Sequence, residues 1–400
     1  MLLEGLKVVE MSTWVAGPSA AAVLGDWGAE VTKVESPIGD ATRVYYPDGP
    51  DTPGNPIFTN ENRGKKGVVL DLTRPGAKEA LKALLREADI FITNVRPGSL
   101  KRQGLDYDSL KGEMPRLIYA AVTGYGLTGP EADTPAFDIT AFWTRSGVAR
   151  AMIPSDQTPF PSRPGFGDHV TALAAVSGIL AAVHERHETG RGRLVETSLI
   201  RAGAYAVSWD LGVQLRFGDV VTAQPREDRP VAHSGFFPTQ DDRWVCLLPR
   251  TLDDFTNLML ALDRPELVAE ERFEPPVRDP AAVAELRDIL DDAFRAFTLE
   301  DICARLREFD LAHAPLGTLG ELAEAPYAHE AGCFQDVEDG WGGTFKTTAA
   351  PVRFPEGAPQ VGRAAPRLGQ HTLSVLQAAG VEPAEIEALI AAGGAVQGGA

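Results

Sequence analysis

Apolar runs of strand length alternate with stretches of helical periodicity along the first third of the chain. The expected strands are residues 6–11, 30–35, 67–72, 89–95 and 117–122. Residues 16–29, which are rich in small side chains, and the amphipathic residues 76–88 are expected to form helices between them. Strands and helices that alternate at this spacing predict a parallel sheet with right-handed crossovers. We therefore expect an α/β fold whose large domain is Rossmann-like.

The turn after the first expected strand has the sequence MSTWVAGPSA. It lacks the GxGxxG pattern with which dinucleotide-binding folds bring the backbone close to a pyrophosphate. A nicotinamide or flavin dinucleotide site is therefore disfavoured.

A long helix is expected over residues 168–187, where apolar side chains fall on every face. A helix of this kind is buried in a core. Its apolar run, residues 170–183, is too short to span a bilayer, so we expect no membrane partner. Residues 193–198 follow as a strand.

A proline- and charge-rich stretch at residues 222–230 is typical of a linker, so a second domain is expected after it. One strand and four helices are then expected, at residues 243–248, 252–262, 281–297, 371–379 and 383–391. The glycine-rich tail beyond them is expected to be disordered.

The formal net charge of −18 makes nucleic acid an unsuitable partner, because a phosphate backbone demands a basic surface. A phosphate-bearing ligand would need a local basic patch. The three cysteines, Cys246, Cys303 and Cys333, lie far apart with no CxxC spacing, which argues against a disulfide framework and a zinc site. No secretory leader is apparent, and we expect a cytoplasmic protein.

Asp168 is the first residue of interest for chemistry. It follows the turn-forming stretch PSRPGFG and opens the long apolar helix, which predicts an N-cap. Capping explains an aspartate here without any catalytic role. The glycine-rich loop before it would nevertheless admit a ligand, and a helix dipole would keep the carboxylate ionised as a nucleophile requires.

A basic corner is expected at residues 94–102, where a helix should begin at Ser99 directly after a strand. Backbone amides at a helix start, together with basic side chains, can bind phosphate. A solvated helix face explains the same residues equally well. The basic residues of this corner are Arg96, Lys101 and Arg102. A second basic cluster, Arg63, Lys65 and Lys66, is expected to add to the positive electrostatic field there.

Several segments together resemble CoA transferase family III, the group that includes formyl-CoA, carnitine and benzylsuccinate CoA transferases. They begin with LEGLKVVEMSTWVAGPSAAAVLGDWGAEVTKVESPIGDATR and continue with GVVLDLTRPGAKEAL, ADIFITNVRPGSLKRQGLDYDSL and PRLIYAAVTGYGLTGP. GDHVTALAAVSGILAAVHERHETGRGRLVETSL and PRLGQHTLSVLQAAGV complete the set. The resemblance covers nearly the whole chain in the expected order.

The resemblance implies that Asp168 is the nucleophile. It implies a CoA pocket formed by Val15, Ala16, Leu70, Leu72, Thr73, Asn94, Val95, Arg96, Arg102, Pro135, Ala136, Phe137 and Asp138. It also implies an interlocked homodimer. The implied domains are a large CoA-binding domain (1–220), a small α+β domain (221–330) and a C-terminal segment that returns to the large domain (331–400).

The implied activity moves CoA between an acyl-CoA thioester and a carboxylic acid through an aspartyl-CoA intermediate, with no prosthetic cofactor or metal. One alternative is a 2-methylacyl-CoA racemase of the same fold. Phe137 stands where those enzymes have a histidine, and it cannot act as a base. A non-catalytic CoA-binding protein is the other alternative.

Some residues depart from the pattern of formyl-CoA transferases. Val15 replaces a polar residue, and residues 233–237 stand where those enzymes have a glycine-rich flap near the nucleophile. The aromatic residues within 137–145 suggest a larger acyl group. Arg145 is expected either to bind a second substrate carboxylate or to form a structural salt bridge.

Overall fold

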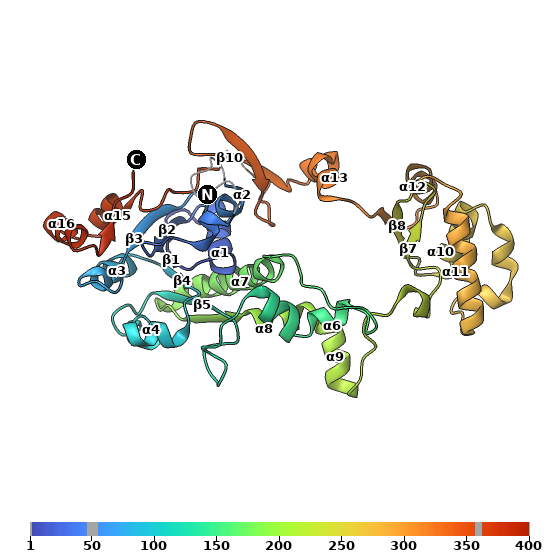
Figure 1. Cartoon of the computed structure of the whole chain (residues 1–400), viewed down its shortest axis with the longest axis horizontal. Helices are drawn as coiled ribbons and strands as arrows, with labels where there is room; N and C mark the ends of the chain where they lie inside the picture. The colour runs from blue at the N-terminus through green and yellow to red at the C-terminus, as the bar shows by residue number, and fades with distance from the viewer. Residues whose placement is uncertain (1, 46–54, 357–361, 400) are drawn as a thin grey trace. The chain divides into compact units, whose positions relative to one another are not determined.

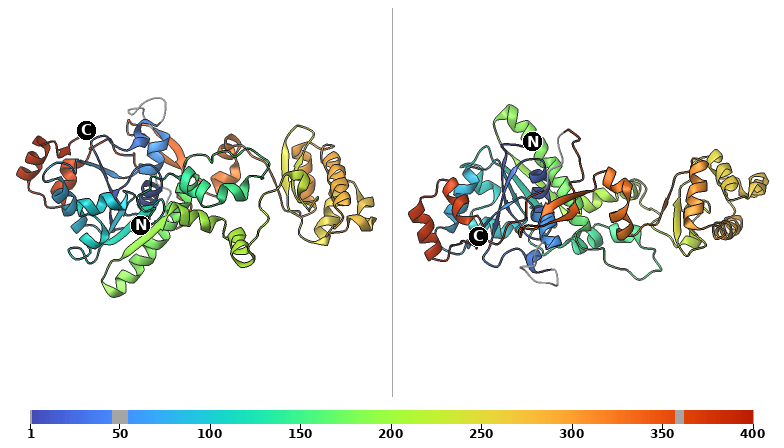
Figure 2. Two further views of the ribbon diagram at one scale, coloured as in Figure 1. Left: turned by 60° about the horizontal axis from the view of Figure 1, so that its bottom comes forward. Right: turned by 90° about the horizontal axis from the view of Figure 1, so that it is seen from above.

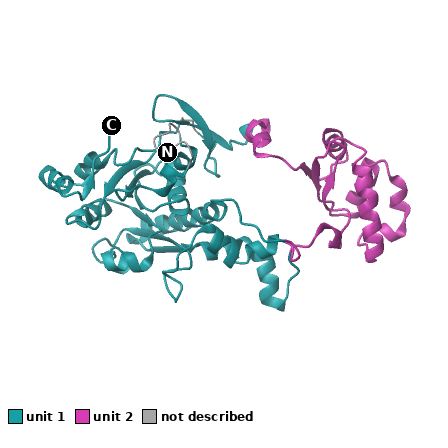
Figure 3. Cartoon of the chain, viewed as in Figure 1, with its two compact units in different colours: residues 1–153, 158–222, 329–400 teal, residues 154–157, 223–328 magenta. Residues whose placement is uncertain are grey.

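The computed structural model describes residues 2–45, 55–356 and 362–399, which form two compact units (Figure 3). Unit 1 comprises Met1–Ile153, Thr158–Thr222 and His329–Ala400. Unit 2 comprises Pro154–Gln157 and Ala223–Ala328. The expected domain limits, 220/221 and 330/331, lie within two residues of the changes at Thr222 and Ala328.

Unit 1 is built on a seven-stranded sheet of order β12-β3-β2-β1-β4-β5-β6 (Figure 1). The strands are β1 (Lys7–Met11), β2 (Glu30–Glu35), β3 (Lys66–Leu70), β4 (Ile90–Thr93), β5 (Ile118–Thr123), β6 (Leu194–Ser198) and β12 (Ala395–Val396). All pairs are parallel except β12 with β3. The expected α/β fold with a parallel-dominated sheet is confirmed.

The strand order reverses between β1 and β4. From β1 the chain proceeds to β2 and β3 on one side of the sheet, and then returns to place β4, β5 and β6 on the other. In open parallel sheets the carboxyl ends of two such strands border a crevice, and ligands bind there. The turns after β1 and β4 are therefore the first place to look for a site.

Helices cover both faces of this sheet. One face packs against α3 (Ala77–Arg86), α4 (Pro97–Gln103), α5 (Tyr107–Leu110), α15 (Thr372–Ala378) and α16 (Pro383–Ala391). The other packs against α1 (Ala16–Asp26) and α7 (Phe166–Thr189). Neighbouring strand residues such as Val8 and Val9 enter opposite cores, as the alternation of a strand requires. Figure 2 shows the C-terminal helices, in red, beside the blue strands and helices of the N-terminal third.

Helix α7 has 24 residues and is long and apolar enough to cross a membrane by length and composition alone. The expectation that its apolar run is too short for this was wrong. In the structure the helix packs against α1, β5 and β6. The expectation that it is buried on all faces is also wrong, because Leu173 is exposed and only one side faces the core.

A smaller cluster lies beside α7 in the same unit. It is formed by the π-helical turn η2 (Asp138–Arg145), α6 (Val148–Met152) and α8 (Leu199–Ala206). The following helix, α9 (Ser208–Phe217), buries none of its residues. On the other side of α1 lie η1 (Ala41–Val44) and α2 (Pro56–Asn62), the latter packed directly on α1.

Unit 2 has its own core and a three-stranded antiparallel sheet of order β7-β8-β9. Its elements are β7 (Gly235–Pro238), β8 (Trp244–Leu247), β9 (His313–Pro315), α10 (Leu252–Ala261), α11 (Pro280–Phe294), α12 (Leu299–Glu308) and α13 (Leu319–Glu324). Short 3-10 turns connect them at η3 (Arg226–Asp228), η4 (Pro265–Ala269) and η5 (Glu271–Phe273), and α14 (Pro326–Glu330) leads back to unit 1. The first strand, β7, was not predicted, because GFFP is short and has no polar alternation.

The returning segment opens with a hairpin of β10 (Phe334–Glu338) and β11 (Thr344–Thr348). It ends in β12, which pairs with the outer edge of β3. The expectation of a disordered tail was therefore wrong. Thr372 joins the two strands, because its Oγ1 accepts from the Val69 N–H at 3.1 Å and donates to the Val396 carbonyl at 2.7 Å. No local pattern in a glycine-rich tail reveals such a distant partner.

Candidate active site

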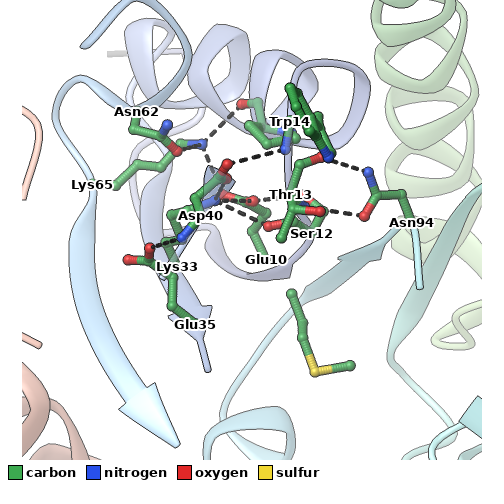
Figure 4. Close-up of polar contacts among 12 residues, drawn as sticks. Glu10, Ser12, Thr13, Trp14, Lys33, Glu35, Asp40, Asn62, Lys65 and Asn94 are labelled. Carbon is green, nitrogen blue, oxygen red and sulfur yellow. Dashed lines mark hydrogen bonds and ion pairs between the residues drawn. The ribbon is translucent and has the colours of Figure 1, made fainter. Parts of the chain in front are cut away.

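The turns after β1 and β4 are tied together by one side chain. The Nδ2 of Asn94 donates to the Thr13 carbonyl at 2.7 Å, and the Thr13 N–H donates to Asn94 Oδ1 at 3.1 Å (Figure 4). The family resemblance implies that Asn94 belongs to the CoA pocket. In the structure its amide ties the β1–α1 turn to the end of β4, so the position of this turn depends on it.

Below this turn lies a group of fully buried charges, here called the buried ion cluster: Glu10, Lys33, Asp40 and Lys65. The Lys33 Nζ lies 3.1 Å from Glu10 Oε1 and 2.9 Å from Asp40 Oδ2. The Lys65 Nζ lies 2.7 Å from Glu10 Oε2 (Figure 4). Lys33 also donates to the Ser12 carbonyl at 3.0 Å, so the cluster supports the turn from beneath.

Burial and pairing act against each other within the cluster. Burial lowers the pKa of Lys65 to about 8, even though the nearby Glu10 carboxylate opposes that shift. Burial would raise the pKa of Glu10, yet Lys33 and Lys65 together hold it below its usual range. The paired charges therefore persist because each compensates the desolvation of the other.

Three basic residues that were expected to strengthen the positive charge of the corner at 94–102 are instead paired with acidic side chains. Lys65 belongs to the buried ion cluster, Arg63 forms a salt bridge with Asp26, and Lys66 pairs with Glu30 at 2.8 Å. The expectation that these side chains reinforce a phosphate site was wrong. Their acidic partners lie 30 or more positions away in the chain, where no local pattern could reveal them.

The corner at residues 94–102 differs from its prediction in one respect. Helix α4 begins at Pro97, before Ser99, and the Gly98 N–H donates to Asp133 Oδ1 at 2.7 Å. A carboxylate of the chain itself therefore occupies the helix start, so its amides are not free for phosphate. The basic side chains remain accessible.

Three exposed cations remain at this corner: Arg96, Lys101 and Arg102. Across residues 2–45, 55–356 and 362–399 none of them has an ion-pair partner. Beside them Val95 is half-buried against the core, with its N–H bonded to Thr93 Oγ1 at 3.2 Å. The corner therefore offers guanidinium and ammonium groups to solvent.

At the end of β3, the predicted pocket residues differ in accessibility. Leu70 is buried and Leu72 packs against the same core. Thr73 is exposed, and its Oγ1 donates to Asp71 Oδ1 at 2.6 Å. Of these side chains only Thr73 is open to a ligand.

The loop of residues 135–138 passes close to the end of β5. A Cβ on Gly124 would lie 2.2 Å from the Cβ of Ala136, so only glycine permits this approach. Pro135 and Phe137 are exposed, whereas Asp138 is buried. The Asp138 Oδ2 has no hydrogen-bond partner in the part of the chain that the structure describes.

Asp168 lies in the first turn of α7, but it is not the N-cap. Gly165 takes that position with φ +85°, and Asp168 is the third residue of the helix. A Cβ on Gly167 would meet the Phe142 ring at 2.3 Å, so a glycine is needed for α7 to start against η2. The N-cap prediction was wrong because Phe166 and Gly167 extend the helix backwards.

The start of α7 also lies against the β1–α1 turn. Val15 Cγ1 is 3.8 Å from the Cβ position of Gly165, and Ala16 is buried at the start of α1. Elements from three distant segments therefore meet around Asp168: the β1–α1 turn, the 135–138 loop and the start of α7.

The family model of CoA-transferase family III matches residues 3–372. The chain belongs to this family. It is therefore a CoA transferase, and the resemblance noted in the sequence is confirmed.

Two curated relatives are similar over nearly their whole length. The (R)-2-hydroxy-4-methylpentanoate CoA-transferase of Clostridioides difficile is 33% identical, covering 96% of this chain and 97% of the relative. The cinnamoyl-CoA:phenyllactate CoA-transferase of Clostridium sporogenes is 32% identical, covering 97% and 96%. A CAIB/BAIF family protein from Brucella suis has a similar structure, with a TM-score of 0.83, 28% identity and coverage of 94% and 99%.

The carboxyl group of Asp168 in this CoA transferase is much less acidic than that of an ordinary aspartate. Burial, followed by the negative charge of Asp138, raises its pKa to about 7, and His169 opposes the rise. The expectation that the helix dipole keeps this group ionised was wrong. Desolvation outweighs the dipole where a carboxyl lies beside a second acid.

Glu61 is a residue of this site that the sequence did not indicate. It is buried on α2, and its Oε1 lies 3.0 Å from His169 Nε2. Burial would lower the pKa of His169, but the bond to Glu61 raises it overall. No local pattern pairs these two residues, because Glu61 lies 108 positions before His169 in the chain.

Two further expectations concern Arg145 and residues 233–237. Arg145 lies 3.1 Å from Glu131 and over the ring of Tyr125, so the structural salt bridge is the reading that the structure supports. Residues 233–237 belong to unit 2, and their place beside Asp168 stays a prediction. Within the described ranges, no group of three or more His, Cys, Asp or Glu side chains is arranged to hold a metal ion.

With Asp168 as the expected nucleophile, we predict that the kcat/KM of this CoA transferase rises with pH through about 7, because a nucleophilic carboxyl must be ionised. Asp138→Asn should shift this limb to lower pH, since it removes the neighbouring negative charge. Initial rates across pH measure both. Glu79→Gln on the exposed side of α3 is the control. If the rise of kcat/KM with pH occurs at the same pH in Asp138→Asn as in the wild type, the charge of Asp138 does not raise the pKa of Asp168.

We also predict that Glu10→Gln lowers the free energy of unfolding by about 3 kcal/mol or more, because it leaves Lys65 buried without its carboxylate. Urea titration measures this change. Glu30→Gln removes the same charge from the half-exposed Lys66 pair and should cost less than about 1 kcal/mol. An equal loss of unfolding free energy in the two variants would show that the buried ion pair contributes no more to stability than the half-exposed one.

Proposed function

We propose that this enzyme transfers CoA from an acyl-CoA thioester to a carboxylic acid through a covalent aspartyl-CoA at Asp168. The observation that carries the proposal is the position of Asp168. It lies beside the β1–α1 turn, which stands at the sheet's switch point, and close enough to Asp138 to feel its charge. Burial makes this carboxylate a poorly solvated, and hence reactive, nucleophile once it is ionised.

The reaction consists of four acyl transfers. The Asp168 carboxylate attacks the thioester carbonyl and expels CoA thiolate, which gives a mixed anhydride. The thiolate then attacks the aspartyl carbonyl and releases the donor acid, leaving aspartyl-CoA. The acceptor carboxylate attacks this thioester and forms a second anhydride as the thiolate leaves. The thiolate finally attacks the acyl carbonyl of that anhydride, which releases the new acyl-CoA and regenerates Asp168.

The CoA itself is proposed to lie across the crevice formed by the turns after β1 and β4. Arg96 and Arg102 are exposed, have no competing ion pair among the described residues and suit its phosphates. Val15, Thr73 and Phe137 border the same edge of the sheet. No prosthetic group enters the proposed chemistry.

The acids exchanged are proposed to be 2-hydroxy acids, or related acids, with a branched or aryl side chain. The names of the two curated relatives point to such acids, and the aromatic residues around Phe137 suit them. A racemase reaction is less well supported, because Phe137 provides no base and the relatives are named as transferases.

A homodimer is also proposed. Helix α9 buries none of its residues and exposes Trp209 (87%) and Phe217 (76%). Apolar side chains gathered on one exposed helix are typical of a surface that another subunit covers. A second copy of this chain is the partner that the family resemblance implies.

The covalent intermediate is directly testable. Hydroxylamine added during turnover should convert aspartyl-CoA at Asp168 to a hydroxamate, and borohydride should reduce it to an alcohol. Mass spectrometry of the peptide that contains Phe166–His169 detects either change. Asp168→Ala should form no adduct and lose transfer by at least about a thousandfold, because nucleophilic catalysis is removed.

The same experiment on Asp138→Asn is the matched control, since that variant keeps the nucleophile. In the wild-type enzyme, an adduct on Asp138 in place of Asp168 would assign the nucleophile to the loop of residues 135–138. Transfer that proceeds with no adduct on any carboxylate would overturn the covalent mechanism. A racemase would exchange the α-proton with solvent and form no adduct.

The phosphate contacts give a separate prediction. Arg96→Ala and Arg102→Ala should each raise the KM for acyl-CoA about fivefold at low ionic strength, the equivalent of ~1 kcal/mol for an exposed contact. The effect should shrink in high salt because exposed charges are screened. Arg86→Ala, on the exposed side of α3, is the control. An unchanged KM at low salt would place the phosphates elsewhere.

A further inference from the structure

Three aromatic side chains meet beside the β1–α1 turn: Trp14, Tyr45 and Phe137. The ring centroid of Trp14 lies 5.8 Å from that of Tyr45 and 5.5 Å from that of Phe137, edge to face in both pairs. Tyr45 and Phe137 are each 53% exposed. The three rings, here called the aromatic wall, therefore present apolar surface that no described part of the chain covers.

The aromatic wall borders the nucleophile. Phe137 directly precedes Asp138, whose charge acts on Asp168. Val15, which follows Trp14, touches the Gly165 position that caps the helix of Asp168. The rings of Trp14 and Phe137 therefore stand on the two segments that flank the start of the helix carrying Asp168.

The backbone of Trp14 has a costly conformation. Its φ is +67°, in the left-handed region that non-glycine residues avoid at a cost of about 1 kcal/mol or more. Three hydrogen bonds hold the turn there. The Trp14 N–H donates to Asp40 Oδ1 at 3.2 Å, and Thr13 is clamped by Asn94 (Figure 4).

Asp40 connects this strained residue to the buried ion cluster. Its Oδ2 lies 2.9 Å from Lys33 Nζ, and Lys33 reaches the Ser12 carbonyl two residues before Trp14. No step of the transfer uses these buried charges. Replacing buried ion pairs by apolar side chains is often neutral or stabilising, so the cluster is better explained by what it positions than by stability.

We propose that Trp14 is the specificity-determining residue for the acyl group, and that Asp40 is the residue that positions it. The aromatic wall accepts the branched or aryl side chain of the acyl-CoA or acid. The inference rests on the proposed transfer at Asp168 and adds the residue that selects its substrate. Apolar contact with one such side chain is worth a discrimination of about tenfold or more.

The test is the ratio of kcat/KM for 3-phenylpropionyl-CoA to that for acetyl-CoA, with one common acceptor acid. Trp14→Ala should lower this ratio about tenfold by acting on the aryl thioester alone, and Trp14→Phe should restore most of it. Trp27→Ala is the matched control. Trp27 stands at the far end of α1 with its ring against Phe354, so its loss should leave the ratio unchanged.

The role of Asp40 is tested by a double-mutant cycle. Asp40→Asn should lower the same ratio in the wild-type background, because the carboxylate that holds the turn loses its charge. In the Trp14→Ala background it should leave the ratio unchanged, since the ring that it positions is absent. A purely structural Asp40 would lower both rates equally in both backgrounds.

Two results would overturn the inference. One is a Trp14→Ala variant whose kcat/KM is unchanged for both thioesters, and the other is an equal fall of kcat/KM with both, because either result leaves the ratio as it is in the wild type. Hydroxamate trapping at Asp168, run on the same wild-type and Trp14→Ala samples, distinguishes a failure of the aromatic-wall proposal from a failure of the proposed transfer mechanism. An adduct with an unchanged ratio rejects the aromatic wall alone, whereas an absent adduct in the wild type rejects the transfer mechanism.

Discussion

The ammonium of Lys33, held between the carboxylates of Glu10 and Asp40 with no access to water, is the contact on which the active-site edge depends. It joins the end of β1 to the segment after β2, and through Ser12 and Asp40 it fixes the turn that starts α1. Asn94 completes the frame from β4. The turn between β1 and α1 is therefore held in place by charges that are buried away from solvent.

Two carboxyl groups in this molecule have opposite surroundings. Asp40 faces a lysine in the core, which holds its pKa below the usual range against the effect of burial. Asp168 faces another acid, and burial raises its pKa to about 7. The two acids therefore differ in protonation: Asp40 is held ionised by its lysine partner, whereas Asp168, which faces a second acid, takes up a proton near neutral pH.

The sequence predicted those features that depend on local periodicity. β2 and α16 have the bounds that their patterns indicated, and the parallel sheet followed from the alternation of strands and helices. Features that depend on distant pairing could not be predicted. Lys65 looked like a surface cation until Glu10 was placed beside it, and Glu61 had no visible partner before the fold brought His169 to it. Asp168 was found by resemblance and local context, but its acidity follows only from the folded surroundings.

Unit 1 is assembled from segments that lie on both sides of unit 2 in the chain. Residues 223–328 leave the ribosome as a continuous stretch with a core of their own, whereas the sheet of unit 1 lacks its edge strand until residues 395–396 have been made. Domains generally fold as units during synthesis. The smaller unit can therefore finish folding first, although residues 2–45 and 55–153 of the larger one are made before it, and β3 keeps this edge unpaired until residues 395–396 have been made.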